Sequence, residues 1–140
     1  MCGPSVAAMT TITNVIGLSV VVTDMARALA FYRALGIDVP AGQDGQPHAE
    51  AVLGNGFRLM FDTVDVITSF DPTWTTPGGG HRAALAVECT DPAAVDALYD
   101  ALVRDGHSGH LAPFDAVWGQ RYAVVDDPDG NPIDLCAPSA

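Results

Sequence analysis

The sequence predicts an α+β fold in which two βαβββ modules follow one another and form curved, partly open mixed sheets around a cleft. The main observation is an internal repeat, because the stretch LSVVVTD ending at Asp24 is echoed by LAVECTD ending at Asp91. A tyrosine follows each aspartate at the same spacing, Tyr32 in the first copy and Tyr99 in the second. Turn motifs between apolar runs, such as Gly54-Asn-Gly56, add hairpins to each copy. One supersecondary unit is therefore used twice, and a ligand is expected between the copies.

The first copy begins with alternating residues from Ile16 to Val22, which is typical of a strand. Thr23 or Asp24 can cap the helix that follows. The apolar face of this helix has helical spacing, and Gly36 can end it; the face comprises Met25, Ala28, Leu29, Tyr32 and Leu35. Residues 41–47 are a predicted loop, and residues 48–53 and 57–62 are two strands of a hairpin.

Residues 63–81 form the least regular stretch, with Trp74 and a triple glycine, and we expect a connector there. The second copy begins near Arg82, and its first strand ends at Cys89. Thr90 or Asp91 can cap a helix whose first residue is proline. The buried face of this helix is predicted to comprise Val95, Leu98, Tyr99 and Leu102. Three strands should follow near residues 110–112, 120–125 and 132–137, with a turn at residues 127–130.

The length of 140 residues indicates one domain. We expect a loose leader at residues 1–11 and one domain at 12–138, with module one near 12–66 and module two near 80–138. No apolar run reaches the ~20 residues that a membrane-spanning helix needs. The three cysteines, Cys2, Cys89 and Cys136, lack metal-site spacing, so reduced thiols in a cytoplasmic protein are the favoured interpretation.

The net charge is −11, from 17 acidic residues against 6 basic ones, and all six bases are arginine. No basic footprint exists for nucleic acid, and Schiff-base chemistry through a lysine is impossible. An acidic surface favours cationic partners, although solubility alone also explains it, and we give that interpretation more weight.

The chain resembles the vicinal oxygen chelate superfamily, also called the glyoxalase/bleomycin-resistance/dioxygenase fold. The residues that carry the resemblance are Asp24, Phe31-Tyr-Arg33 and Leu35-Gly36, the echo at Asp91, and the ending WGQRYAVVDDPDGNPIDL from Trp118. The similarity covers residues 12–138. It implies a small-molecule ligand and a homodimer, while the charge and hydropathy described above argue against a nucleic-acid or membrane partner. It does not settle the chemistry, because the superfamily contains lyases, dioxygenases, epimerases, thiol transferases and drug-binding proteins.

In metal-using members, the first and last strands of each module supply the ligands. Carried onto this sequence, those positions are Gly17, Met60, Arg82 and Asp134. Glycine has no side chain to bind a metal, and the methionine thioether is too soft for the metals that the family uses. The arginine guanidinium repels a cation, and the single aspartate carboxylate does not make a metal site by itself. The lack of suitable ligands at these positions predicts no metal and no cofactor. In this respect the chain resembles the metal-free, bleomycin-resistance-like branch. His81 lies next to Arg82, and a register error of one residue would bring it into the site.

The candidate ligand-binding residues share an expected place on or near the cleft, and they are Arg82, Asp134, Trp118, Met60, Arg58 and Trp74. Arg82 and Asp134 can form a structural ion pair across the cleft or hold the charged groups of a ligand. Trp118 and Trp74 can contact a ligand or simply anchor their segments. Met60 is the wall of a pocket or part of the core, and a surface position is the default for Arg58. The catalytic candidates are Asp134, His48 and His110, and a structural role is the default for both histidines.

Two functional hypotheses follow. The favoured one is a metal-independent protein that binds or sequesters a cationic or aromatic small molecule. The alternative is an enzyme that uses the same cleft, either as a metal-dependent lyase or dioxygenase or as a metal-free isomerase. In the metal-free enzyme, Asp134 or a histidine moves a proton and Arg82 stabilises an oxyanion.

Overall fold

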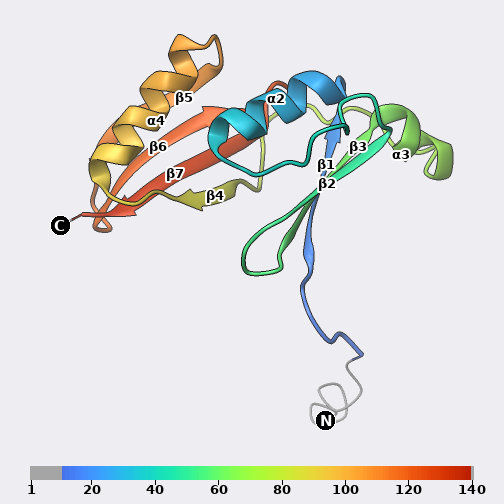
Figure 1. The fold of residues 1–140 in the computed structure, drawn as a ribbon, viewed down its shortest axis with the longest axis horizontal. Helices are drawn as coiled ribbons and strands as arrows, with labels where there is room; N and C mark the ends of the chain where they lie inside the picture. Colours follow the sequence, from blue (N-terminus) through green and yellow to red (C-terminus); the bar gives the residue numbers. More distant parts are fainter. Residues whose placement is uncertain (1–10, 140) are drawn as a thin grey trace.

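The computed structural model describes residues 11–139 and confirms the predicted α+β class. Two separate mixed sheets lie side by side with helices packed against them, as Figure 1 shows. One sheet has three strands in the order β1-β3-β2, and the other has four in the order β4-β7-β6-β5. Nearly all of the expected leader, residues 1–10, lies outside the described residues.

The first module contains β1 (Gly17–Val22), α2 (Met25–Leu35), β2 (His48–Val52) and β3 (Arg58–Thr63). Strand β3 is central, parallel to β1 and antiparallel to β2. The glycine of the predicted hairpin takes the left-handed conformation there, since Gly56 has φ of 85°.

This module has one strand fewer than the predicted βαβββ pattern. The loop before β2 contains glycines and prolines, which disfavour the backbone hydrogen bonds of a strand. A single side chain bonds to the edge of β2 in place of that strand. The amide of Gln43 donates to the Glu50 carbonyl (3.1 Å) and accepts from the Glu50 N–H (3.0 Å). The edge of β2 is thus paired at one residue rather than along a strand.

The second module begins with β4 (Leu85–Glu88) and α4 (Pro92–Arg104). It continues with β5 (Ser108–Ala116), β6 (Gln120–Asp126) and β7 (Pro132–Pro138), so its βαβββ pattern is confirmed. Strand β5 extends beyond the predicted residues 110–112, and its pairing with β6 is interrupted by register shifts.

The helix boundaries follow the capping residues that the sequence offers. The Asp24 side chain accepts from the Arg27 N–H at the start of α2, and the Asp91 side chain does the same for Ala94 in α4. An additional helix, α3 (Val64–Phe70), occupies part of the predicted irregular connector and corrects that expectation. The Thr63 side chain caps it by accepting from the Val66 N–H. The helix has only seven residues, four of them β-branched, and helical periodicity is a weak signal at that length.

One hydrophobic core joins the two modules. The predicted face of α2 is buried in full, and Val95 and Leu102 of α4 are buried in the same cluster. Phe31 of α2 meets the ring of His107, which follows α4, edge to face at a centroid distance of 5.0 Å. Among the described residues, no helix combines the length and apolar composition needed to cross a membrane.

A polar contact crosses the same boundary. The buried Tyr32 hydroxyl on α2 donates to the carboxylate of Asp127, in the turn between β6 and β7, at 2.7 Å. Asp127 is only 3% exposed. The two modules therefore share both an apolar core and a buried hydrogen bond.

Replacing Tyr32 with phenylalanine should lower the free energy of unfolding by about 1–3 kcal/mol, because the buried Asp127 carboxylate loses a donor. The matched control is Tyr99→Phe, the equivalent residue of the second module. Its hydroxyl forms no hydrogen bond within the described chain, so its loss should cost no more than about 0.5 kcal/mol. Urea unfolding of both variants measures the difference, and equal losses would contradict this role for Tyr32.

Candidate functional site

A cavity of about 560 Å³ lies between the two modules, and we call it the intermodule cavity. Its walls come from β1, from the connector around residues 74–85, and from the turn after β6. Two of the predicted site residues, Arg82 and Trp74, line it. The volume falls within the ~300–1,000 Å³ that is usual for small-molecule sites.

The other predicted residues lie on the open faces of the two sheets. Leu59 and Phe61 of β3 are buried towards the helix, so Arg58 and Met60 lie on the opposite face of the first sheet. In β7, the buried Ile133 and Leu135 leave Asp134 on the open face of the second sheet. The structure thus divides the predicted cleft residues among three places.

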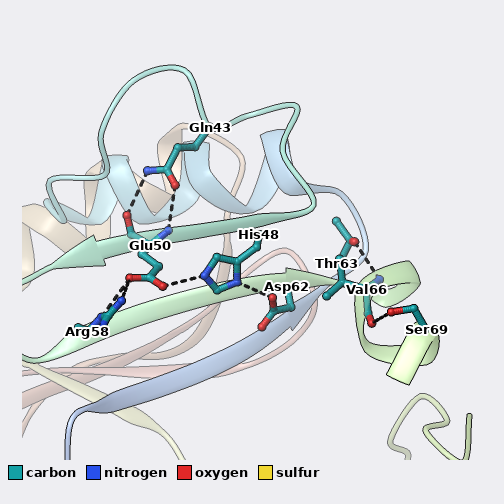
Figure 2. Close-up of polar contacts among 8 residues, drawn as sticks. All are labelled: Gln43, His48, Glu50, Arg58, Asp62, Thr63, Val66 and Ser69. Atoms are coloured by element: carbon teal, nitrogen blue, oxygen red, sulfur yellow. Dashed lines mark hydrogen bonds and ion pairs between the residues drawn. The ribbon is translucent and has the colours of Figure 1, made fainter. Parts of the chain in front are cut away.

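Four charged side chains form a connected network on the open face of the first sheet, shown in Figure 2. We call His48, Glu50, Arg58 and Asp62 the first-sheet network. His48 bonds through Nδ1 to Asp62 (2.5 Å) and through Nε2 to Glu50 (2.8 Å). The Arg58 guanidinium donates to the other Glu50 oxygen. Cross-strand pairing explains the arrangement, because His48 lies opposite Asp62, and Glu50, which lies opposite Met60, is a diagonal neighbour of Arg58.

The network raises the pKa of His48 above its ordinary value, mainly through the hydrogen bond to Asp62 and then through the one to Glu50. The hydrogen bonds from His48 and Arg58 lower the pKa of Glu50. Because each ring nitrogen faces a carboxylate, which only accepts, the imidazole is held in its protonated form. Both nitrogens are occupied, so His48 has no nitrogen to offer a substrate in this arrangement.

His110 forms a similar pair in the second module, where its Nδ1 lies 3.0 Å from the Asp126 carboxylate. Within the described chain, its Nε2 has no hydrogen-bond partner. A carboxylate that orients one nitrogen while the other stays available is the arrangement of a general base. Of the two histidine candidates, His110 has the geometry better suited to proton transfer, although its side chain is 57% exposed.

Three aromatic rings gather on the open face of the second sheet, beside Asp134. Trp118 meets Tyr122 at a centroid distance of 5.2 Å, and Phe114 meets Tyr122 at 5.8 Å, both edge to face. We call Phe114, Trp118, Tyr122 and Asp134 the aromatic face. The pKa of the Tyr122 hydroxyl is raised, first by burial and then by its hydrogen bond to Asp134.

The aromatic face has acidic surroundings and no arginine. Glu88 and Cys136 are register partners on neighbouring strands, on the same side of the sheet as Asp134. The arginine of this sheet, Arg121, instead pairs with Asp96 on α4, on the opposite side. Trp118 is 58% exposed and Phe114 37%, so the rings are accessible.

The four positions that correspond to metal ligands in the family are divided between the two sheets and the intermodule cavity. A Cβ added to Gly17 would lie 2.1 Å from the Arg58 carbonyl oxygen, so the backbone leaves no room for a side-chain ligand there. Arg82 lines the intermodule cavity, whereas Met60 and Asp134 lie on different sheets. Within residues 11–139, no three His, Cys, Asp or Glu side chains are grouped to hold a metal ion.

The predicted ion pair between Arg82 and Asp134 does not form, and neither residue makes an ion pair with any described residue. The strand register gives the reason. Asp134 lies opposite Ala86 on β4, whereas Arg82 precedes that strand and lines the intermodule cavity, which Asp134 does not line. His81 lines the same intermodule cavity as Arg82.

Two features of the site were not predicted from the sequence. Tyr122 follows the predicted Trp118 by four residues, and alternation from the buried Ala123 would have placed it on the open face. The first-sheet network depends on which residues of β2 and β3 lie opposite each other. The Gly54-Asn-Gly56 turn constrains that register, so the pairing of His48 with Asp62 was accessible in principle.

Comparisons with known proteins agree on the family. Residues 12–135 match the sequence profile described as Glyoxalase/Bleomycin resistance protein/Dioxygenase superfamily. The uncharacterized protein Rv0887c of Mycobacterium tuberculosis (strain ATCC 25618 / H37Rv) is 32% identical over 123 residues. That alignment covers 84% of this chain and 71% of the relative.

Solved structures of similar fold support the same architecture. A glyoxalase/bleomycin resistance protein/dioxygenase family enzyme from Burkholderia phytofirmans PsJN matches with a TM-score of 0.77 and 16% identity, covering 90% of this chain and 99% of its own. A glyoxalase/bleomycin resistance protein/dioxygenase from Nocardioides matches with a TM-score of 0.72 and 22% identity, covering 97% and 91%. At these identities the likeness concerns the fold alone. The predicted homodimer and cytoplasmic location stay predictions.

The first-sheet network predicts a pH-dependent contribution to stability. A histidine whose pKa is raised on folding stabilises the protein fully below its unfolded pKa of about 6.5, and the contribution is lost as the pH rises through the folded value. His48→Gln should therefore destabilise the protein more at about pH 5.5 than at about pH 9. Urea unfolding at the two pH values measures this effect.

The control is the titration of His48 followed by NMR. Its midpoint should lie above about 6.5 in the unmodified protein and should fall towards that value in Asp62→Asn. A midpoint at or below 6.5 in the unmodified protein would show that the carboxylates do not hold the imidazolium.

Proposed function

The chain belongs to the glyoxalase/bleomycin resistance protein/dioxygenase superfamily, and on that premise we propose that it is a metal-independent protein that binds an aromatic or cationic small molecule. The observation that carries the proposal is the aromatic face, where Phe114, Trp118 and Tyr122 lie beside the Asp134 carboxylate. Binding and sequestration, rather than turnover, is the proposed role.

The chemistry of this face suits an organic cation. Aromatic rings attract a cation through their quadrupole, by about 0.5–2 kcal/mol per contact. Asp134 adds a negative charge on the same face, and the nearest arginine of the sheet, Arg121, is held on the other side by Asp96. The net charge of −11 increases the encounter rate with cations.

Metal independence is supported by the residues at the metal positions. Only Asp134 of the four offers a donor suited to a hard or borderline divalent ion, and the backbone closes the position at Gly17. The enzyme alternative that uses Asp134 and Arg82 together loses support, because Arg82 lines the intermodule cavity and Asp134 does not.

Binding of a cation should depend on Trp118 and Asp134. The chain has two tryptophans, so Trp74→Phe leaves Trp118 as the sole tryptophan reporter of the aromatic face. We expect 1-methylquinolinium to quench its fluorescence saturably, and the neutral analogue quinoline at about pH 8 to bind roughly fivefold more weakly. Asp134→Asn should remove most of that difference.

The matched control is Asp100→Asn, which removes the same charge from the exposed surface of α4. It should leave the affinity for 1-methylquinolinium within about twofold, since a distant surface charge is screened by salt. The proposal fails if 1-methylquinolinium does not bind, or if Asp134→Asn and Asp100→Asn have equal effects.

Addition of Zn²⁺, Ni²⁺, Mn²⁺ or Fe²⁺ should not raise the melting temperature of the purified protein, because residues 11–139 contain no donor set of the family type. Thermal unfolding with each metal and with a chelator measures this. A large stabilisation by one metal that is lost in Asp134→Asn would reinstate a chelate-type site and a lyase or dioxygenase activity.

A further inference from the structure

The intermodule cavity is separate from the aromatic face and has a different chemistry. None of the four residues of the aromatic face lines it. Its walls are formed by the end of one module, the start of the other and the connector between them. Its ligand can therefore be considered independently of the proposed function.

Most of the wall is apolar. Strand β1 contributes Val20 and Val21, β7 contributes Ile133, and the connector contributes Trp74 and Pro77. Ser19, Thr76 and Asn131 add neutral polar groups. Such a lining suits a ligand with an apolar or aromatic body and few polar groups.

The two charged side chains of the wall, Asp129 and Arg82, differ in whether they are free to bind a ligand. Asp129 is already engaged, because its carboxylate accepts from both the backbone N–H and the hydroxyl of Thr23. Arg82 lines the cavity and forms neither an ion pair nor a side-chain hydrogen bond with any described residue. Of the other arginines, Arg33, Arg58 and Arg121 each pair with a carboxylate, and Arg27 and Arg104 do not line the cavity.

An available guanidinium in a chain of net charge −11 points to an anionic group on the ligand. The planar guanidinium matches a carboxylate with two parallel hydrogen bonds. The cavity has one permanent cation, and the acidic chain around it opposes a second negative charge, so a monocarboxylate suits it better than a phosphate dianion.

We propose that the intermodule cavity binds a small monocarboxylic acid with an apolar or aromatic body, whose carboxylate is held by Arg82 and whose body contacts Trp74. The acid binds in a place distinct from the aromatic face, so the chain carries two ligand sites of opposite charge preference.

The two tryptophans separate the sites experimentally. In a Trp118→Phe background, Trp74 is the sole tryptophan and reports on the cavity. Phenylacetate and octanoate are the probes, phenylacetamide and octanamide are their neutral counterparts, and inorganic phosphate tests for a general anion site. We expect saturable quenching by at least one acid, at least tenfold weaker binding of its amide, and no binding of phosphate at the same concentrations.

Arg82→Gln should weaken binding of the acid at least tenfold, and Arg82→Lys should restore part of it. Arg104→Gln is the matched control, because it removes the same charge from an exposed position at the end of α4 and should change the affinity less than twofold. Thermal unfolding establishes that each variant is folded. Calorimetry on the unmodified protein measures binding that leaves the fluorescence unchanged.

Three results would overturn the proposal: equal binding of acid and amide, an unchanged affinity in Arg82→Gln, or no binding of either acid by calorimetry. None of them bears on the aromatic face, whose reporter is Trp118. Conversely, failure of 1-methylquinolinium to bind would leave the result for the acids unaffected.

Discussion

The arrangement of the two modules depends on one buried carboxylate. Asp127 lies in the turn between β6 and β7, and it accepts hydrogen bonds from the Asp129 and Asn131 N–H groups and from the Asn131 side chain, all at 2.9 Å. Its fourth donor is Tyr32, which belongs to the other module. A buried charge is tolerated only when it is paired or fully hydrogen-bonded, so the turn and α2 must stay together. Burial first, and then the charge of Asp127, raises the pKa of Tyr32, and its hydroxyl therefore remains a donor.

The same turn shapes the intermodule cavity. Within five residues, the turn supplies Asp127 to the hydrogen bond between the modules and supplies Asp129 and Asn131 to the cavity wall. Asp129 adds a second contact between the modules, because its carboxylate accepts hydrogen bonds from Thr23, which connects β1 to α2. The distance between β1 and β7, and so the width of the cavity, is fixed on one side by these contacts. On the other side the connector carries Trp74 and Arg82 and has no strand pairing to either sheet. One wall is therefore hydrogen-bonded across the two modules, and the wall that carries the available cation lies outside the strand pairing.

The sequence predicted those features that depend on local chemistry. The repeat, the aspartate caps of α2 and α4, the buried face of α2 and the strands of the second module were all accessible from capping and periodicity. The short α3 and the missing strand of the first module were not. In the first module, the Gln43 side chain bonds to the edge of β2, and no periodic pattern in the sequence predicts such a contact. The separation of Arg82 from Asp134 depends on strand register and on the path of the connector, which local patterns do not specify.

The two modules have diverged in what their open faces offer. In the first, His48 pairs with Asp62 and is also held by Glu50, which Arg58 binds in turn, so the charges satisfy one another. In the second, His110 and Asp126 form the corresponding pair without a third partner for the ring. The open face of the first sheet carries the paired Arg58 and Glu50, whereas the open face of the second sheet carries aromatic rings and a carboxylate. A face whose charges are mutually paired gains little from a ligand, because binding must first break those contacts. A face with accessible rings and an acid without an ion-pair partner can gain from a cation without that cost, which is why the proposed ligand is assigned to the second module.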